Sequence, residues 1–153
     1  MNTYFLPWTQ DMGLQVEELN QGHHRLMDKL NALLTATSSK DQMAVSLAFS
    51  NLTAEVQSHF DAEEKLMRDI GYPDLEEHCA HHERLWQTLD DLRFIVSSAQ
   101  SFPDEAGLFE SVDEWLVPHL THDDKKLADF LTAHSPPASA AAAREGNANG
   151  LNK

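Results

Sequence analysis

The chain has 153 residues, with 11 lysine and arginine residues against 25 aspartate and glutamate residues, and therefore a formal net charge of −14. Its length is typical of one domain. Its acidity argues against phosphate backbones and anionic membrane surfaces, so we expect no nucleic acid or membrane as partner, and the charge favours a monomer. Cys79 is the single cysteine and cannot form an internal disulfide, and the N-terminal sequence lacks a signal-peptide pattern, so we expect a cytoplasmic protein. The nine histidines are not explained by this composition.

Four amphipathic segments separated by turn sequences follow an N-terminal arm at about residues 1–18. Apolar residues recur with the helical period at about 19–37, from the loop at 37–41 to about 70, at 74–98 and at 104–133. No segment alternates as a strand does, and the residues after 134 are rich in alanine and small polar types. We therefore predict an all-α, up-down-up-down four-helix bundle over residues 1–134 and a disordered C-terminal tail at 135–153.

Five histidines and one glutamate stand where the apolar stripes of these helices require apolar residues. In chain order they are His23, His59, Glu63, His78, His82 and His119. A lone histidine on an apolar face is usually a core residue with one hydrogen-bond partner. Five of them, drawn from all four predicted helices, would leave ring nitrogens without partners, whereas a metal centre would satisfy one nitrogen of each.

The remaining four histidines serve as an internal control. They are His24, His81, His122 and His134. The first three lie about 100° around their helices from the apolar stripe, and the last is close to the predicted tail. We predict that they are surface residues, and we assign them no role.

The sequence indicates the identity of the metal and of its second carboxylate ligand less directly. Five imidazoles and a carboxylate exceed the needs of one tetrahedral zinc ion and, without thiolate, suit iron or manganese in a two-metal site. A second carboxylate is expected from the fourth helix, where Asp123 is four residues after His119 and Asp124 is five after it. On a regular helix, Asp124 would lie about 140° around the axis from His119, but a π-bulge near Pro118 would return Asp124 to the same face. Periodicity leaves both residues open.

Together these residues resemble a known family. The motifs are N-x-x-H at 20–23, H-F-x-x-E at 59–63, H-x-x-x-H at 78–82 and W-L-x-x-H-L-x-x-x-D at 115–124, with LMRDIGYP at 66–73. The chain resembles the hemerythrins, and in particular the single-domain bacteriohemerythrins, over about residues 4–131. The resemblance implies a non-haem di-iron centre that binds O2 reversibly for storage, delivery or sensing, and a binding protein rather than an enzyme.

The resemblance also implies how the ligands are divided. One iron would take three imidazoles, those of His78, His82 and His119. The other would take His23 and His59 and keep an open position for O2. Two carboxylates, Glu63 and Asp124, would bridge the ions together with an oxo or hydroxo group. The family spacing thus favours Asp124, with Asp123 as the fallback.

The family's apolar O2 pocket maps onto four residues of this chain. They are Phe60, Trp115, Leu116 and Leu120. None of them is an obvious general acid, which favours reversible binding. The main alternative is a di-iron peroxidase or oxidase acting on peroxide or nitric oxide, and a second is a purely structural metal site.

Overall fold

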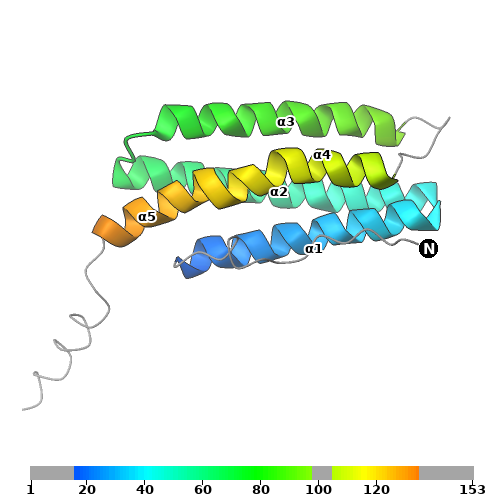
Figure 1. Ribbon diagram of the computed structural model, residues 1–153, viewed down its shortest axis with the longest axis horizontal. Helices are drawn as coiled ribbons and strands as arrows, with labels where there is room; N and C mark the ends of the chain where they lie inside the picture. Colours follow the sequence, from blue (N-terminus) through cyan, green and yellow to red (C-terminus); the bar gives the residue numbers. More distant parts are fainter. Residues whose placement is uncertain (1–15, 98–104, 135–153) are drawn as a thin grey trace, which may run out of the picture.

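The computed structural model describes residues 16–97 and 105–134. Within these ranges it contains helices and no strand. The helices are α1 (Glu17–Ser39), α2 (Gln42–Ile70), α3 (Leu75–Ser97), α4 (Glu105–Pro118), the π-helical η2 (His119–Asp123) and α5 (Asp124–His134). The last three follow one another without a break and form the fourth rod of the bundle (Figure 1). Successive rods run in opposite directions (Figure 1), so the predicted all-α four-helix bundle is confirmed.

Two predicted segments fall on other parts of the chain. The N-terminal arm at 1–18 lies almost wholly outside the described residues, and the tail at 135–153 lies wholly outside them. The division into a domain at 1–134 and a disordered tail therefore stays a prediction.

The ends of α2 show why the helices begin and end close to their predicted positions. At its start, the Asp41 side chain accepts hydrogen bonds from the backbone N–H groups of Met43 (2.9 Å) and Ala44 (3.3 Å), which have no partner within the helix. At its end, Gly71 adopts the left-handed conformation with φ +66°, and the N–H of Tyr72 bonds back to the carbonyl of Met67. These caps fix a sharp entry to and exit from the longest helix.

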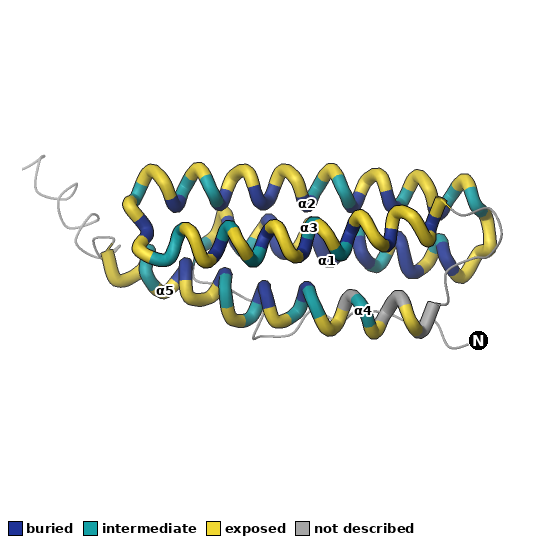
Figure 2. The backbone as a smooth tube through the Cα atoms, turned by 90° about the horizontal axis from the view of Figure 1, so that it is seen from above, coloured by how far each residue is buried: buried dark blue, intermediate teal, exposed yellow. Residues whose placement is uncertain are grey.

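The apolar core is divided along the bundle axis. Figure 2 shows the buried residues of each helix turned toward the other helices. One apolar cluster includes Leu26, Phe60 and Leu120, whereas a second includes Leu19, Met67 and Leu127. Polar residues predicted from sequence lie between members of the two clusters, namely His23 between Leu19 and Leu26, Glu63 between Phe60 and Met67, and Asp124 between Leu120 and Leu127. A polar layer thus separates two apolar ones, and it must be stabilised by its own contacts or by a bound cation.

No helix within 16–97 and 105–134 is both long enough and apolar enough to span a membrane.

Candidate metal centre

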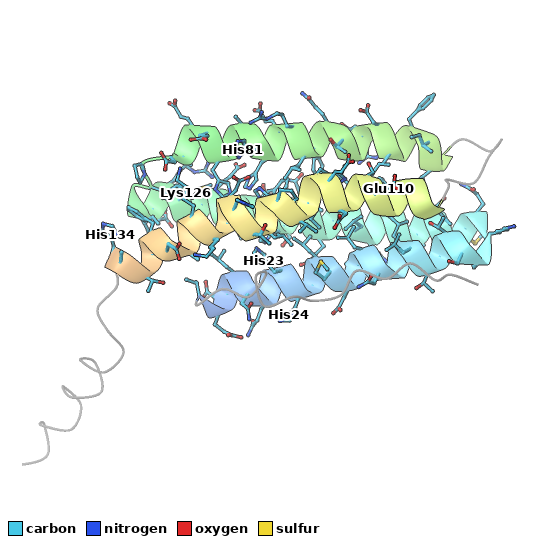
Figure 3. The ribbon with its side chains drawn as sticks, viewed as in Figure 1. His23, His24, His81, Glu110, Lys126 and His134 are labelled. Atoms are coloured by element: carbon cyan, nitrogen blue, oxygen red, sulfur yellow. The ribbon has the colours of Figure 1, made fainter. Side chains whose placement is uncertain are left out.

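All seven predicted ligands meet in the polar layer. They are His23 on α1, His59 and Glu63 on α2, His78 and His82 on α3, His119 on η2, and Asp124 at the start of α5. Each is at most 6% exposed, and Glu63 and Asp124 are fully buried. Figure 3 shows the contrast on α1, where His23 points into the bundle and His24 points away from it.

The π-helical turn decides which aspartate joins them. The N–H of Asp124 bonds to the carbonyl of His119, five residues earlier, in place of the usual four. Pro118, just before this turn, has no N–H to offer to the preceding turn of α4. The wider turn carries Asp124 into the layer and leaves Asp123 at its outer edge, with 26% of its side chain exposed. Of the two residues that periodicity left open, the structure brings Asp124 into the cluster.

Glu63 presents its two oxygens to different histidines. Its Oε1 lies 3.0 Å from Nε2 of His59. Its Oε2 lies 3.2 Å from Nε2 of His78 and 3.1 Å from Nε2 of His82. The carboxylate therefore stands between one histidine of α2 and two of α3.

Asp124 repeats this arrangement from the opposite rod. Its Oδ2 lies 2.7 Å from Nε2 of His23 and 3.2 Å from Nε2 of His59. Its Oδ1 lies 3.2 Å from Nε2 of His78 and 3.1 Å from Nε2 of His119. Each carboxylate thus directs one oxygen toward His59 of α2 and the other toward His78 of α3.

The potential ligand atoms fall into two overlapping groups, within each of which they lie no more than 4.8 Å apart. The first group, which we call the three-histidine half, consists of Glu63, His78, His82, His119 and Asp124. The second, the two-histidine half, consists of His23, His59, Glu63 and Asp124. Two carboxylates that belong to both halves are the arrangement expected for two bridged metal ions.

Several of these close approaches are not hydrogen bonds. Oε1 of Glu63, Nε2 of His119 and Oδ1 of Asp124 are buried and have no partner in hydrogen-bond geometry. These three atoms lie near neighbouring polar atoms but are not oriented toward them for hydrogen bonding. Ligand atoms arranged around a common cation have this geometry. A buried polar atom without a partner is costly, and a cation between these atoms would satisfy them. The residues present therefore fit a metal centre of nitrogen and oxygen ligands.

The electrostatics of the layer favour positive charge. Burial alone would lower the pKa of His59 and His119, but the neighbouring charges of Glu63 and Asp124 and the hydrogen bonds to carboxylates raise both to about 10. Burial also lowers the pKa of His78, but the neighbouring carboxylates of Asp124 and Glu63 raise it to about 9. Burial would raise the pKa of Asp124, but the charge of His119 and hydrogen bonds from the histidines hold it well below its ordinary range. The layer therefore attracts cations, whether protons or metal ions.

The four residues of the predicted O2 pocket belong to the larger apolar cluster or pack against it, and Phe60 reaches histidines of both halves, with its ring centre 6.1 Å from that of His59. Leu116 and Leu120 are buried in the larger apolar cluster, and Trp115 packs against it partly exposed. Phe60 stacks on the ring of His82, with ring centres 3.8 Å apart and planes 6° apart, and meets His119 edge-on at 5.8 Å. An apolar wall therefore covers one side of the histidine layer.

One of the four control histidines differs from the prediction. His24, His122 and His134 are exposed, as predicted. His81 is only 27% exposed, and its Nδ1 lies 2.8 Å from Oδ2 of Asp123. The 100° offset that placed it on the surface ignored the neighbouring rod, which covers that side of α3.

Two other residues beside the layer, Glu64 and Gly22, were not predicted from the apolar periodicity of the helices. Oε1 of Glu64 lies 3.0 Å from Nδ1 of His82. Gly22 leaves room for His59, because a Cβ atom on it would lie 3.0 Å from Nδ1 of His59. Both contacts join different helices, and a sequence period within one helix cannot predict them. The adjacency of Glu64 to Glu63 and of Gly22 to His23 is the only local hint.

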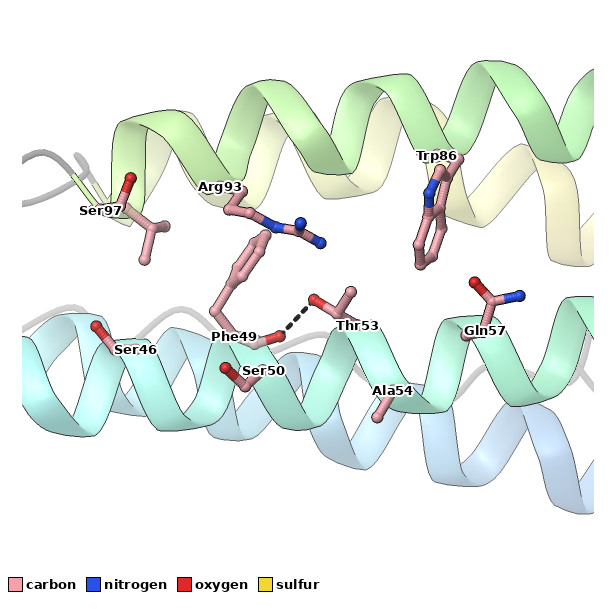
Figure 4. A pocket seen from close by; sticks show the side chains of 10 residues that line it. Ser46, Phe49, Ser50, Thr53, Ala54, Gln57, Trp86, Arg93 and Ser97 are labelled. Atoms are coloured by element: carbon pink, nitrogen blue, oxygen red, sulfur yellow. Dashed lines mark hydrogen bonds between the residues drawn. The ribbon is translucent and has the colours of Figure 1, made fainter.

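A groove of about 550 Å³ between α2 and α3 lies apart from this layer (Figure 4). Its walls carry serine and threonine hydroxyls, with Phe49, Trp86 and Arg93 among the lining residues. None of the seven candidate ligands lines it. The candidate site of this protein is therefore the buried layer and not its open groove.

Comparisons with known proteins agree with this geometry. The family model described as the hemerythrin HHE cation binding domain matches residues 14–131. A bacteriohemerythrin of Stenotrophomonas maltophilia is 30% identical over 129 residues, which cover 84% of this chain and 83% of the relative. Bacteriohemerythrins of Pseudomonas aeruginosa and Methylococcus capsulatus are each 28% identical, over 82% and 84% of this chain and 81% and 98% of their own lengths.

A solved structure shares the fold. A hemerythrin with a leucine-to-tyrosine substitution superposes with a TM-score of 0.74 over 83% of this chain and 97% of its own, at 23% identity. The family match spans both apolar clusters and the polar layer between them. The chain therefore belongs to the hemerythrin family.

Proposed function

We propose that the buried layer holds two non-haem iron ions per chain and that the ion in the two-histidine half binds O2 reversibly. One observation carries the two-ion part of this proposal. Glu63 and Asp124 each direct one oxygen to either half, as bridging carboxylates do. Membership of the hemerythrin family and a donor set of imidazole and carboxylate support iron over zinc.

The unequal halves support O2 binding at one ion only. The three-histidine half offers five ligand groups and the two-histidine half four. If one further oxygen bridges the two ions, six-coordination is complete in the first half and one position stays open in the second. Two ferrous ions would supply the electrons that O2 binding requires, one from each ion.

The residues around the layer support binding in preference to turnover. Phe60, Leu116 and Leu120 are buried and apolar, so they exclude water and offer no proton. A bound O2 molecule that receives no proton from its surroundings can leave unchanged. The relatives reported above are named as hemerythrins and not as enzymes, which also favours a binding protein for storage, delivery or sensing of O2.

The test is to load the metal-free protein with two equivalents of ferrous iron under argon and to cycle it between air and argon. We expect a visible absorption band that appears in air, disappears under argon and returns for several cycles. Iron content measured on the same sample should be two per chain.

The same experiment separates the alternatives. Rapid irreversible oxidation in air, with turnover of O2, peroxide or nitric oxide when a reductant is added, would contradict the proposal and indicate an oxidase or peroxidase. A protein that binds two zinc ions but gives no reversible band with iron would indicate a structural metal site.

A further inference from the structure

Two pairs of consecutive acidic residues border the polar layer, and each pair holds one imidazole at both of its nitrogens. In the pair Glu63-Glu64, the first residue contacts Nε2 of His82 at 3.1 Å and the second contacts Nδ1 of the same ring at 3.0 Å. In the pair Asp123-Asp124, the order is reversed. Asp124 lies 3.1 Å from Nε2 of His119, and Asp123 accepts a hydrogen bond from Nδ1 at 3.0 Å.

The helix geometry explains how neighbouring residues reach opposite sides of one ring. His82 lies on α3, across from α2, so its ring enters between the side chains of Glu63 and Glu64. His119 lies on the same rod as its pair, where residues four and five positions later would point about 100° apart on a regular helix. The π-helical turn removes that conflict by bringing Asp124 to the inner nitrogen while Asp123 keeps the usual four-residue contact with the outer one.

The inner and outer members of each pair have different surroundings. The inner carboxylates, Glu63 and Asp124, are fully buried and shared by both halves of the layer. The outer carboxylates, Glu64 and Asp123, are 27% and 26% exposed. His81 lies next to the same oxygen of Asp123 that accepts from His119, with its Nδ1 2.8 Å from Oδ2. This contact restrains Asp123 at the edge of an open groove of about 410 Å³ between α3 and the fourth rod.

We propose that Glu64 and Asp123 are positioning residues that raise the metal affinity of the three-histidine half. A carboxylate that accepts the Nδ1–H of an imidazole fixes its tautomer, turns Nε2 toward the metal and increases the donor strength of that nitrogen. Both imidazoles held in this way, His82 and His119, belong to the three-histidine half. Because that half also offers five ligand groups against four in the two-histidine half, it fills first and holds its ion more tightly.

This inference rests on the proposed two-metal site, but its test requires neither iron nor O2. Metal-free protein is titrated with Co²⁺ in competition with a chelator, and we expect two binding steps. His23→Ala, which removes a ligand of the two-histidine half only, should abolish the weaker step and so identify the tighter one with the three-histidine half.

The outer carboxylates are then changed one at a time. Asp123→Asn and Glu64→Gln should each lower the affinity of the tighter step about 10- to 100-fold, the usual effect of losing an outer partner of a metal-binding histidine. His81→Ala should lower the same step by a smaller factor, and Asp123→Glu should restore part of the loss. Asp129→Asn on α5 and Asp61→Asn on α2 remove the same charge at exposed positions and should leave both steps unchanged.

A second measurement distinguishes positioning from a structural role. In the Zn²⁺-loaded protein, NMR should show a slowly exchanging, strongly deshielded Nδ1–H proton on both His82 and His119. Asp123→Asn should shift only the signal of His119, and Glu64→Gln only that of His82, with helicity and melting temperature unchanged.

The outcomes are distinguishable. Two Co²⁺ steps in the wild type, with Asp123→Asn and Glu64→Gln behaving like the exposed controls, would overturn the inference and leave the proposed function standing. A wild-type protein that binds fewer than two Co²⁺ ions per chain would overturn both.

Discussion

The two halves of the polar layer share Glu63 and Asp124 but differ in how many histidines they offer and in what lies behind them. In the three-histidine half, carboxylates contact the outer nitrogens of His82 and His119. In the two-histidine half, the backbone of α1 comes close to His59 at Gly22. Shared ligands couple the two halves, whereas the unshared ones make them unequal. A protein that needs one saturated ion and one open ion can obtain both from a single layer of a four-helix bundle by this means.

The largest effect should come from removing what the halves share. Glu63→Ala deletes a carboxylate that contacts histidines of both halves. We expect both metal affinities to fall by more than about 100-fold, beyond the usual effect of an outer partner. The measurement is metal content per chain after dialysis, with circular dichroism to show that the helices persist. Glu76→Ala, at an exposed position on α3, is the control, and two retained ions in Glu63→Ala would refute the bridging role.

Removing an unshared ligand should separate the halves. His23→Ala should leave one ion bound, in the three-histidine half, and abolish the O2-dependent absorption band. His24→Ala changes the next residue of α1, which points away from the layer (Figure 3), and should keep both ions and the band. Reversible O2 binding by His23→Ala would show that the open position has been assigned to the wrong half.

The pH dependence should also differ between the halves. At pH 7, His78 and His119 in one half and His59 in the other carry protons in the metal-free protein, because their pKa values are raised to about 9, 10 and 10. Metal binding must displace these protons, so affinity should rise with pH from about 6.5 to 10, by up to about tenfold per pH unit for each proton released.

Calorimetry in buffers of different ionisation enthalpy should count at least two protons released in the three-histidine half and at least one in the other. The folding stability of the metal-free protein should change in the opposite direction and fall as pH rises. A histidine with a raised folded-state pKa stabilises the fold fully below the unfolded value of 6.5, and this contribution is lost as pH rises through 9 to 10. Fewer than two protons released in the three-histidine half, none released in the other, or an affinity that falls with rising pH would contradict these charge assignments.

A smaller effect should follow from closing the space beside His59. Gly22→Ala would place a Cβ atom 3.0 Å from Nδ1 of His59, so the ring must shift away from its metal-binding position. We expect the weaker metal step to lose about tenfold in affinity, similar to the loss of an outer partner, and the tighter step to change little. In a helix interior the same substitution normally adds about 0.5–1 kcal/mol of stability, so the weaker metal affinity should fall while the metal-free helix is not destabilised. Gln21→Ala is the exposed control, and an unchanged weaker step in Gly22→Ala would show that the close approach has no role.

The fold and most of the site follow from periodicity, because both depend on which side of a helix a residue occupies. Leu26, Leu52 and Leu89 are buried as their stripe predicts, and the histidines in the same phase are buried with them. The caps at Asp41 and Gly71 are local sequence features, so the ends of α2 could be predicted to within a residue or two.

The rest depends on departures from a regular helix and on contacts between helices. Periodicity could not choose between Asp123 and Asp124, because the π-helical turn changes the angle between successive residues. The predicted exposure of His81 was wrong for a related reason, since the angle of a residue around its own helix says nothing about the neighbouring rod. Consecutive acidic residues that bracket one imidazole can be recognised only when the partner helix is in place.

The central claim is that the layer holds two ions with unequal ligand sets. A crystal structure of the iron-loaded protein, with anomalous scattering collected at the iron absorption edge, tests this most directly. We expect two iron positions per chain bridged by Glu63 and Asp124, one bound by His78, His82 and His119 and the other by His23 and His59 with a position free of protein ligands. A single iron position, or two positions with equal numbers of histidine ligands, would contradict this description of the site.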